Sequence, residues 1–188
     1  MKEFSTKNNF CVFLTQADDL GRVVIPKEIR RTMRIHEGDP LEIFTSKDGE
    51  VIFKKYSAVG DLANFATEYA EALYKISGYS AAITDKDVVI AVSGTGKKDL
   101  SDKKISNELE EIMRERTSVT SKNKSVENIS VSSENDKYFC HIVIPIISEG
   151  DTIGAVVIFS NREEEKVTET EDKLAITAAT VLGKIFEN

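Results

Sequence analysis

Residues 18–31 have the sequence Asp-Asp-Leu-Gly-Arg-Val-Val-Ile-Pro-Lys-Glu-Ile-Arg-Arg, and the rest of the chain is organised around them. Residues 19–21 are typical of a turn, because Gly21 can take a positive φ that other residues resist. The β-branched run at 23–25 predicts a strand. Pro26 ends that strand, and its fixed φ suits the first turn of a helix.

A short basic helix is predicted from Pro26 to Ile35, with Ile29 and Met33 one helical turn apart. Its basic residues have the spacing i, i+3, i+4 and i+7, so the sequence places them on one face, opposite the apolar pair: Lys27, Arg30, Arg31 and Arg34. Such a face is either a solvated helix surface or a phosphate-binding stripe, and the spacing alone leaves both interpretations open.

The rest of the N-terminal part predicts strands at residues 10–14, 41–45 and 50–54. Lys47-Asp48-Gly49 is a strong hairpin turn signal between the last two. So few elements cannot bury much core alone, and dimerisation is the natural remedy.

Residues 19–31, Ile-His-Glu-Gly-Asp-Pro-Leu-Glu-Ile-Phe at 35–44 and Gly-Glu-Val-Ile-Phe-Lys-Lys-Tyr at 49–56 carry a resemblance. They are similar to the swapped-hairpin domain of AbrB-type transition-state regulators, over residues 14–56. The resemblance implies that two chains interleave their hairpins into one small β-barrel that binds double-stranded DNA. Together with its C-terminal part, the chain resembles the family of such regulators that acts on late sporulation genes in spore-forming bacteria.

The resemblance also implies the DNA contacts, which are Arg22, Lys27, Arg30, Arg31 and Arg34. The first strand of the family usually carries a basic pair, where this chain has Thr15 and Gln16, followed by Ala17 in place of a larger apolar residue. We therefore expect weaker binding, with a log–log salt slope smaller by roughly 0.9 for each phosphate that the missing charges leave without a partner.

The chain has 188 residues, of which 40% are hydrophobic and 30% charged, as is ordinary for a globular protein. The net charge of −7 argues against a general nucleic-acid binder. The charge divides unevenly, however, into +1 for residues 1–56 and −8 for residues 57–188. We predict a DNA-binding domain at 1–56 and a separate acidic domain at 57–188, whose charge does not prevent DNA binding by the first.

Several signals predict a cytoplasmic, nucleoid-associated protein. The longest clean apolar run, residues 153–159, is too short to span a bilayer, and no secretory signal is visible. Cys11 and Cys140 lie far apart without metal spacing, which is typical of free thiols. The sequence predicts no metal site, no cofactor and no membrane contact.

The acidic domain begins after a linker at 57–60 with a helix from Asp61 to Ile76. This helix either faces only the core or also pairs with its copy in another subunit. The elements predicted after it are a hairpin at 81–84 and 88–92, a flexible loop at 93–98 that lacks phosphate-loop spacing, a helix at 105–113 and a strand at 126–131.

The last elements predicted are a strand at 138–147 broken by Pro145, a strand at 152–159 and a final helix opened by the capping box Thr168–Glu171. The second domain is thus an α+β layout with helices on one side of an antiparallel sheet. Residues 145–160 and the helix after them resemble the last strands of a GAF domain. That resemblance implies tetramer assembly, leaves open whether the domain also binds a small-molecule effector or serves only in assembly, and identifies no ligand-binding residue.

Nothing in the sequence predicts catalysis. His36 lies in a turn, and His141 and Cys140 are neighbours in a strand, so their side chains point to opposite faces. Two other hypotheses stay open. The N-terminal fold also serves antitoxin-like interaction modules, which usually end in a disordered tail. Cys140 is either a core thiol or a redox-sensing one in a GAF-like pocket.

Overall fold

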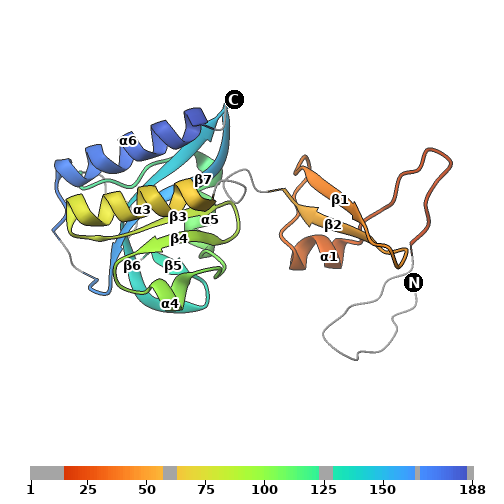
Figure 1. Cartoon of the computed structure of the whole chain (residues 1–188), viewed down its shortest axis with the longest axis horizontal. Helices are drawn as coiled ribbons and strands as arrows, with labels where there is room; N and C mark the ends of the chain where they lie inside the picture. Colours follow the sequence, from red (N-terminus) through yellow and green to blue (C-terminus); the bar gives the residue numbers. More distant parts are fainter. Residues whose placement is uncertain (1–14, 57–62, 123–128, 164–165, 186–188) are drawn as a thin grey trace. The chain divides into compact units, whose positions relative to one another are not determined.

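The computed structural model describes residues 15–56, 63–122, 129–163 and 166–185. The chain divides into two compact units, residues 1–56 and residues 57–188, which are described separately (Figure 1). The strand predicted at 10–14 and the linker predicted at 57–60 lie outside the described residues.

The first unit consists of one short helix and one hairpin, α1 (Lys27–Thr32), β1 (Leu41–Thr45) and β2 (Val51–Lys55). The two strands are antiparallel, with Leu41 opposite Lys55 at one end and Thr45 opposite Val51 at the other. Gly49 has a φ of 82° in the turn between them, where glycine is favoured. The hairpin prediction is confirmed to within one residue.

Two N-terminal predictions are wrong in extent. Residues 23–25 do not form a strand, and a single antiparallel bridge joins Ala17 and Val23 instead. The basic helix ends at Thr32 rather than at Ile35, because Arg34 has a φ of 50° and cannot continue it.

The first unit has no core of its own within residues 15–56, where every residue is exposed or half-buried and none is fully buried. Large apolar side chains lie exposed on its hairpin and on the segments that flank α1: Leu20, Val24, Met33, Ile43, Phe44, Val51, Ile52 and Tyr56. Apolar side chains exposed to this extent favour burial against a further surface.

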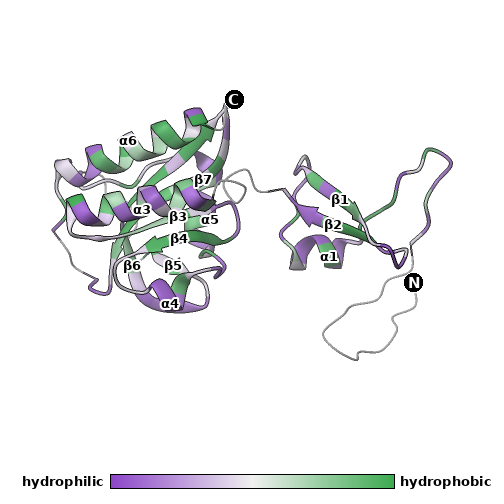
Figure 2. Ribbon diagram, viewed as in Figure 1, coloured by the Kyte–Doolittle hydropathy of each residue, from purple (hydrophilic) through white to green (hydrophobic). Residues whose placement is uncertain are grey.

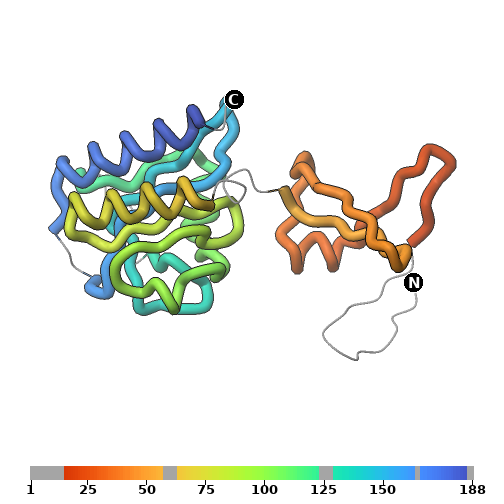
Figure 3. Tube along the Cα trace, viewed as in Figure 1, coloured from red at the N-terminus to blue at the C-terminus, as the bar shows by residue number. Residues whose placement is uncertain are grey.

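The second unit is built on a five-stranded sheet in the order β4-β3-β7-β6-β5, in which every neighbouring pair is antiparallel. Its strands are β3 (Ser80–Asp85), β4 (Val89–Ser93), β5 (Ser130–Ser132), β6 (Asn135–Ser148) and β7 (Asp151–Ser160). Its helices are α3 (Ala63–Ser77), α4 (Lys97–Leu100), α5 (Asn107–Glu115) and α6 (Glu169–Ile185). Figure 3 traces this path along the chain.

The sheet has a hydrophobic core on each face. On one face, α3 and α6 lie side by side and bury Ala70, Leu73, Ala178 and Leu182 against the strands (Figure 1). On the other face, α4 and α5 contribute Leu100, Leu109, Ile112 and Met113 to a second cluster. The prediction that all helices cover one side is therefore wrong. Figure 2 shows the cause, since the central strands are hydrophobic along their length and must be covered on both faces.

Strand β6 differs from its prediction at two positions. Pro145 does not break it, because the ladder with β7 continues through Pro145 opposite Ala155. Proline fits there because, on the side of β6 away from β7, β5 pairs only as far as Phe139 and Val119 forms an isolated bridge to Val143, so neither requires a hydrogen-bond donor at position 145. The ladder does shift between Cys140 and Ile142, where one extra residue forms a bulge.

The segment predicted as a flexible loop at 93–98 leads into α4 instead. Gly96 takes a φ of 86° directly before this helix, and the N–H of Thr95 donates to Ser80 Oγ over 2.9 Å. The strand predicted at 126–131 corresponds to β5, although residues 126–128 lie outside the described residues.

Candidate nucleic-acid interface

The turn before α1 is organised by one carboxylate. Asp18 Oδ1 accepts the N–H groups of Leu20 and Arg22 over 3.0 and 2.8 Å. The backbone adds bonds between Asp18 and Arg22 and between Gly21 and Asp18, both of 3.0 Å. The N–H and guanidinium of Arg22 hold the pKa of Asp18 below its usual value. The result is a turn closed by four hydrogen bonds, in which Gly21 takes a φ of 75°.

Arg22 projects from this turn with its side chain 72% exposed. Its Nε lies 2.6 Å from Asp18 Oδ2. An exposed pair of this kind contributes little stability. Its effect is geometric, because it fixes the plane of the guanidinium while the two terminal nitrogens make no further bond among the described residues.

Three basic side chains of α1 are exposed on one face of the helix, as the spacing predicts: Lys27, Arg30 and Arg31. Within the part of the chain that the structure describes, none of them forms an ion pair with a carboxylate. Arg30 and Arg31 lie in the last turn, where the helix dipole favours positive charge. This face is suited to an anion from outside the chain.

Arg34 is not part of that helical face. It is half-buried and follows the C-cap residue Met33 in the left-handed conformation. The N–H of Ile35 donates to the carbonyl of Arg30 over 2.8 Å, and the N–H of Arg34 to that of Arg31 over 3.4 Å. These two bonds form a Schellman motif, which turns the chain away from the helix axis.

A largely shielded ion pair that the sequence analysis missed supports this turn. Lys55 Nζ donates to the carbonyl of Arg34 over 2.8 Å and lies 3.2 Å from Asp39 Oδ2. Asp39 also accepts the N–H of His36 over 2.9 Å. Burial opposes the ionisation of Asp39, but the bond from His36 and the charge of Lys55 outweigh it, so the pKa of Asp39 is lowered. Sequence spacing does not predict these contacts, because Lys55 lies far along the chain from both Asp39 and Arg34. The pairing of β2 with β1, which sets Lys55 opposite Leu41, brings it close to them.

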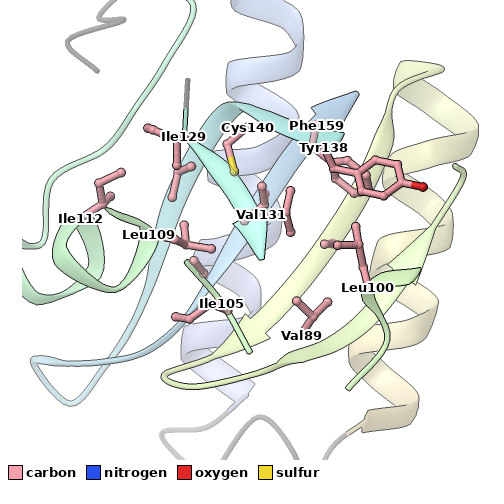
Figure 4. Close-up of a cluster of buried hydrophobic side chains, with 14 of the residues drawn as sticks. Val89, Leu100, Ile105, Leu109, Ile112, Ile129, Val131, Tyr138, Cys140 and Phe159 are labelled. Carbon is pink, nitrogen blue, oxygen red and sulfur yellow. The ribbon is translucent and has the colours of Figure 1, made fainter. Parts of the chain in front are cut away.

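In the second unit, side chains fill the sheet face where a GAF-like pocket is expected. Figure 4 shows Leu100, Ile105, Leu109 and Val131 in one buried cluster with Cys140 and Phe159. The rings of Tyr138 and Phe159 meet edge to face with centroids 5.8 Å apart. The thiol of Cys140 is part of this cluster, and burial, followed by the charge of Glu108, raises its pKa far above the usual value.

The segment 102–106 closes this face by bridging the two edge strands. The N–H of Asp102 donates to the carbonyl of Val89 in β4, and the N–H of Ser106 donates to that of Val131 in β5. Outside the closed face lies an open groove of about 480 Å³, lined by hydroxyls, amides and carboxylates: Ser106, Asn107, Glu108, Ser130, Ser132, Ser133, Glu134, Asn135 and Asp136.

His141 and Cys140, which are neighbours in β6, do not form a Cys–His pair. His141 Nε2 lies 2.8 Å from Ser160 Oγ, while Cys140 packs into the cluster on the other side. Within the described ranges, no group of three or more His, Cys, Asp or Glu side chains is placed to hold a metal ion. Among the helices that the structure describes, none has the length and apolar character needed to cross a membrane.

A family model described as "Stage V sporulation protein T C-terminal, transcription factor" matches residues 61–187. The chain belongs to the stage V sporulation protein T family. Stage V sporulation protein T of Bacillus subtilis (strain 168) is 53% identical to it over 171 residues, which cover 90% of this chain and 94% of that protein. The predictions of family and of a sporulation transcription regulator are confirmed.

The N-terminal unit has relatives of its own. A model described as "Antidote-toxin recognition MazE, bacterial antitoxin" matches residues 14–60. Transition state regulatory protein AbrB of Bacillus subtilis (strain 168) is 56% identical over 41 residues, which cover 22% of this chain and 42% of that protein. The AbrB-like prediction for this unit is confirmed.

Solved structures confirm the GAF-like fold of the second unit. The GAF domain of an Acinetobacter phosphoenolpyruvate-protein phosphotransferase aligns with a TM-score of 0.54 at 11% identity, covering 71% of this chain and 84% of that one. A red/green cyanobacteriochrome in its green light-absorbing state aligns with a TM-score of 0.50 at 13% identity, covering 68% and 94%. At this identity the likeness concerns the fold alone.

Proposed function

We propose that this transcription factor of the stage V sporulation protein T family binds double-stranded DNA through the basic surface of its first unit. That surface consists of Arg22, Lys27, Arg30, Arg31 and Arg34. The observation that carries the proposal is the exposure of Arg30 and Arg31 at the end of α1, with no carboxylate partner among the described residues. DNA phosphates are the anions that such a surface recruits.

The DNA-binding form is a homodimer in which two first units share one core. Support comes from the absence of any buried residue in 15–56 and from the exposed apolar side chains of the hairpin, such as Ile43 and Val51 at 64% and 59% exposure. Burying these side chains against a second copy supplies the core that one copy lacks. The protein acts on the nucleoid in the cytoplasm.

The second units join two dimers into a tetramer through α3. Phe65, Tyr69, Ala72 and Ile76 repeat along α3 at spacings of four, three and four, the pattern of a helix–helix seam. Phe65, Ala72 and Ile76 are exposed, whereas Tyr69 is half-buried and also packs against the core of its own unit. Phe65 and Ile76 are 44% and 69% exposed, although both are large and apolar. These side chains are the ones that a second α3 helix would cover.

The tetramer is tested by light scattering after gel filtration. Ile76→Glu places a charge in the seam, so we expect dimers in place of tetramers. Lys75→Glu is the matched control, because the Lys75 side chain is 75% exposed beside the seam and the change adds the same residue. Tetramers that persist in Ile76→Glu would overturn the α3 seam.

A small-molecule effector is the remaining part of the proposal. The sheet face is filled by the cluster around Phe159 and closed by residues 102–106. An effector therefore either displaces these side chains or occupies the polar groove beside α5, whose lining suits hydroxyl- and amine-rich molecules. A thermal-shift screen of such molecules tests this part, and no shift with any of them would remove it.

DNA binding is tested by fluorescence anisotropy of a labelled double-stranded DNA across a salt series. The wild-type chain is expected to bind with a steep salt dependence. Changing Arg30 and Arg31 together to Ala should reduce the log–log slope by roughly 0.9 for each phosphate that the variant no longer neutralises. Lys97 and Lys98 changed to Ala remove the same charge from exposed positions on α4 and should leave the slope unchanged. Absence of wild-type binding at low salt would refute the proposal.

A second candidate function is an antitoxin-like interaction module, favoured by the antitoxin model that matches residues 14–60. The match extends only to residue 60, just past the start of the second unit at Ser57, and that unit is a folded sheet domain rather than a tail that wraps a toxin. Co-purification of a small toxin with the full chain would support this candidate over the first.

A further inference from the structure

The residue after the basic helix occupies a strained position. Arg34 has a φ of 50° at the C′ position of α1, where glycine is the usual residue because a Cβ disfavours the left-handed conformation. An arginine kept in such a conformation indicates that its surroundings hold it there. Two backbone bonds of the Schellman motif account for part of this restraint, through Arg30 and Arg31.

The third restraint comes from the far end of the hairpin. Lys55 Nζ donates to the carbonyl oxygen of Arg34 over 2.8 Å. The same ammonium lies 3.2 Å from Asp39 Oδ2, and the side chains of the two residues are only 15% and 11% exposed. A charge removed from water to this degree is held firmly by its partners. Lys55 therefore ties the last residue of β2 to the turn that follows the basic helix.

Asp39 fixes the other side of the same turn. Its Oδ2 accepts the N–H of His36 over 2.9 Å, and its own N–H donates to the carbonyl of His36 over 3.2 Å. The carboxylate thus connects the 36–39 turn to Lys55 and, through it, to Arg34. Both ends of the segment between α1 and β1 are held by one ion pair.

The neighbouring lysine offers a direct comparison. Lys54 lies one residue earlier in β2, with its side chain 66% exposed, and its Nζ is 4.0 Å from Glu42 Oε2. Successive residues of a strand point to opposite faces, so Lys54 points away from the turn that Lys55 supports. The two lysines share residue type and strand but differ in burial and in contact with Arg34.

We propose that Lys55 and Asp39 are positioning residues for DNA binding, which hold the Arg34 turn so that Arg30, Arg31 and Arg34 meet the DNA together. This inference rests on the proposed DNA-binding function. Lys55 itself contacts no phosphate, because its ammonium is occupied by the Arg34 carbonyl and the Asp39 carboxylate.

The test is a double-mutant cycle on the full-length chain, with affinity measured by anisotropy on a fluorescein-labelled double-stranded DNA. Lys55→Met keeps all but the terminal atom of the side-chain length and removes the charge, so it should weaken DNA binding by about tenfold, more than Lys54→Met does. Arg34→Ala removes the side chain that Lys55 positions. In the Arg34→Ala background, Lys55→Met should reduce DNA affinity much less than it does in the wild type, because the main contribution of Lys55 is to position Arg34.

A second variant, Asp39→Asn, helps to distinguish an effect on DNA binding from an effect on folding. Asp39→Asn keeps an acceptor for the His36 N–H but loses the charge that faces Lys55, so it should weaken binding in the same direction. Oligomeric state and the unfolding transition are recorded for each variant, and only folded dimers or tetramers enter the comparison. The inference would be overturned if Lys55→Met and Lys54→Met reduced DNA affinity equally. It would also be overturned if Lys55→Met reduced affinity as much in the Arg34→Ala background as in the wild type. Failure of the wild-type chain to bind DNA would instead overturn the proposed function.

Discussion

The guanidinium Nε of Arg22 lies 2.6 Å from Oδ2 of Asp18 in the turn that precedes the basic helix. The same carboxylate accepts the N–H groups of Leu20 and Arg22. A single acidic side chain thus shapes the turn and orients the arginine that projects from it. A carboxylate inside a basic surface is unfavourable for DNA binding by its charge, so its benefit must be geometric.

This relationship gives an unusual expectation for Asp18→Ala. Removing a negative charge from a DNA-binding surface ordinarily raises affinity, yet we expect Asp18→Ala to lower it, because the turn loosens and Arg22 loses its fixed orientation. Anisotropy on duplex DNA measures the effect. Asp19→Ala is the matched control, since Asp19 is the exposed neighbour, and it should leave affinity unchanged or raise it. Equal gains from both variants would contradict the positioning role of Asp18.

A gain of DNA affinity is expected from restoring the basic pair that the resemblance to AbrB-type regulators implies at positions 15 and 16. Thr15 and Gln16 occupy exposed positions in the segment that leads into the Asp18 turn. Changing both to Lys should tighten DNA binding and steepen the log–log salt slope by roughly 0.9 for each new phosphate contact. Thr117→Lys together with Asn161→Lys, both at exposed positions in the second unit, adds the same two charges and controls for net charge. A slope that does not change would place residues 15 and 16 away from the DNA.

Cys140 is expected to be chemically silent in the folded protein. It lies in the hydrophobic cluster, and burial raises the pKa of its thiol, so the reactive thiolate is scarce at neutral pH. In a Cys11→Ser background, where Cys140 is the single thiol, a thiol reagent should react only after denaturant is added. Reaction of the native protein at the rate of the denatured chain would revive the redox-sensing hypothesis.

The elements that the sequence predicted well carry local signals. The hairpin of β1 and β2 follows from Lys47-Asp48-Gly49, and the start of α6 follows from the capping box, in which Glu171 Oε2 accepts both the N–H and the hydroxyl of Thr168. Each of these signals lies within a few residues of the turn or helix start that it specifies. The local sequence therefore determined these two features without the help of tertiary contacts.

The missed features depend on contacts that are distant in sequence. Glycine is the usual residue after the C-cap of a helix, but here Arg34 takes the left-handed conformation in that position. The hydrogen bond from Lys55 to its carbonyl helps to stabilise this conformation. Periodicity therefore extended the helix too far and placed Arg34 on its face. Exposure of Arg30 and Arg31 was foreseeable from spacing, whereas the role of Asp39 and Lys55 required the register of β2.

The bulge near His141 is another feature without a local signal. It lets Tyr138 and Cys140 face one core while Ile142 and Ile144 face the other, which a regular alternation would not allow. Helix α5 lies on the second face because the sheet has a hydrophobic core on both faces. The hydropathy pattern of a single strand does not show which helix covers which face.

Acid should selectively weaken the cap of α6. Burial opposes the ionisation of Glu171, but the hydrogen bonds from the hydroxyl and N–H of Thr168 outweigh it and lower its pKa. A carboxyl whose folded pKa is depressed contributes stability above its unfolded value of about 4.3, and this stability is lost as pH falls through the folded pKa.

The variant that measures this cap is Glu171→Ala. At neutral pH we expect it to lower the free energy of unfolding by about 1 kcal/mol, as for other caps. As the pH falls through the folded pKa of Glu171, the difference from wild type should shrink, because the wild-type carboxylate is progressively protonated there. Denaturant unfolding at the two pH values gives the comparison. A difference that is the same at both would mean that the charge of Glu171 does not stabilise the helix.

Gly183 tests how closely α6 lies against the sheet. A Cβ built at this position would meet the backbone carbonyl of Ile147 in β6 at a separation that real Cβ atoms essentially never show. Helix propensity alone predicts that Gly183→Ala stabilises the protein by about 1 kcal/mol. We expect the opposite sign, a destabilisation of about 1–3 kcal/mol in denaturant unfolding, because the helix must move away from β6. Thr180→Ala, on the exposed face of the same helix, should have little effect. If Gly183→Ala were stabilising, then α6 and β6 would be farther apart than the structure places them, and the core under α3 and α6 would be looser than its buried residues indicate.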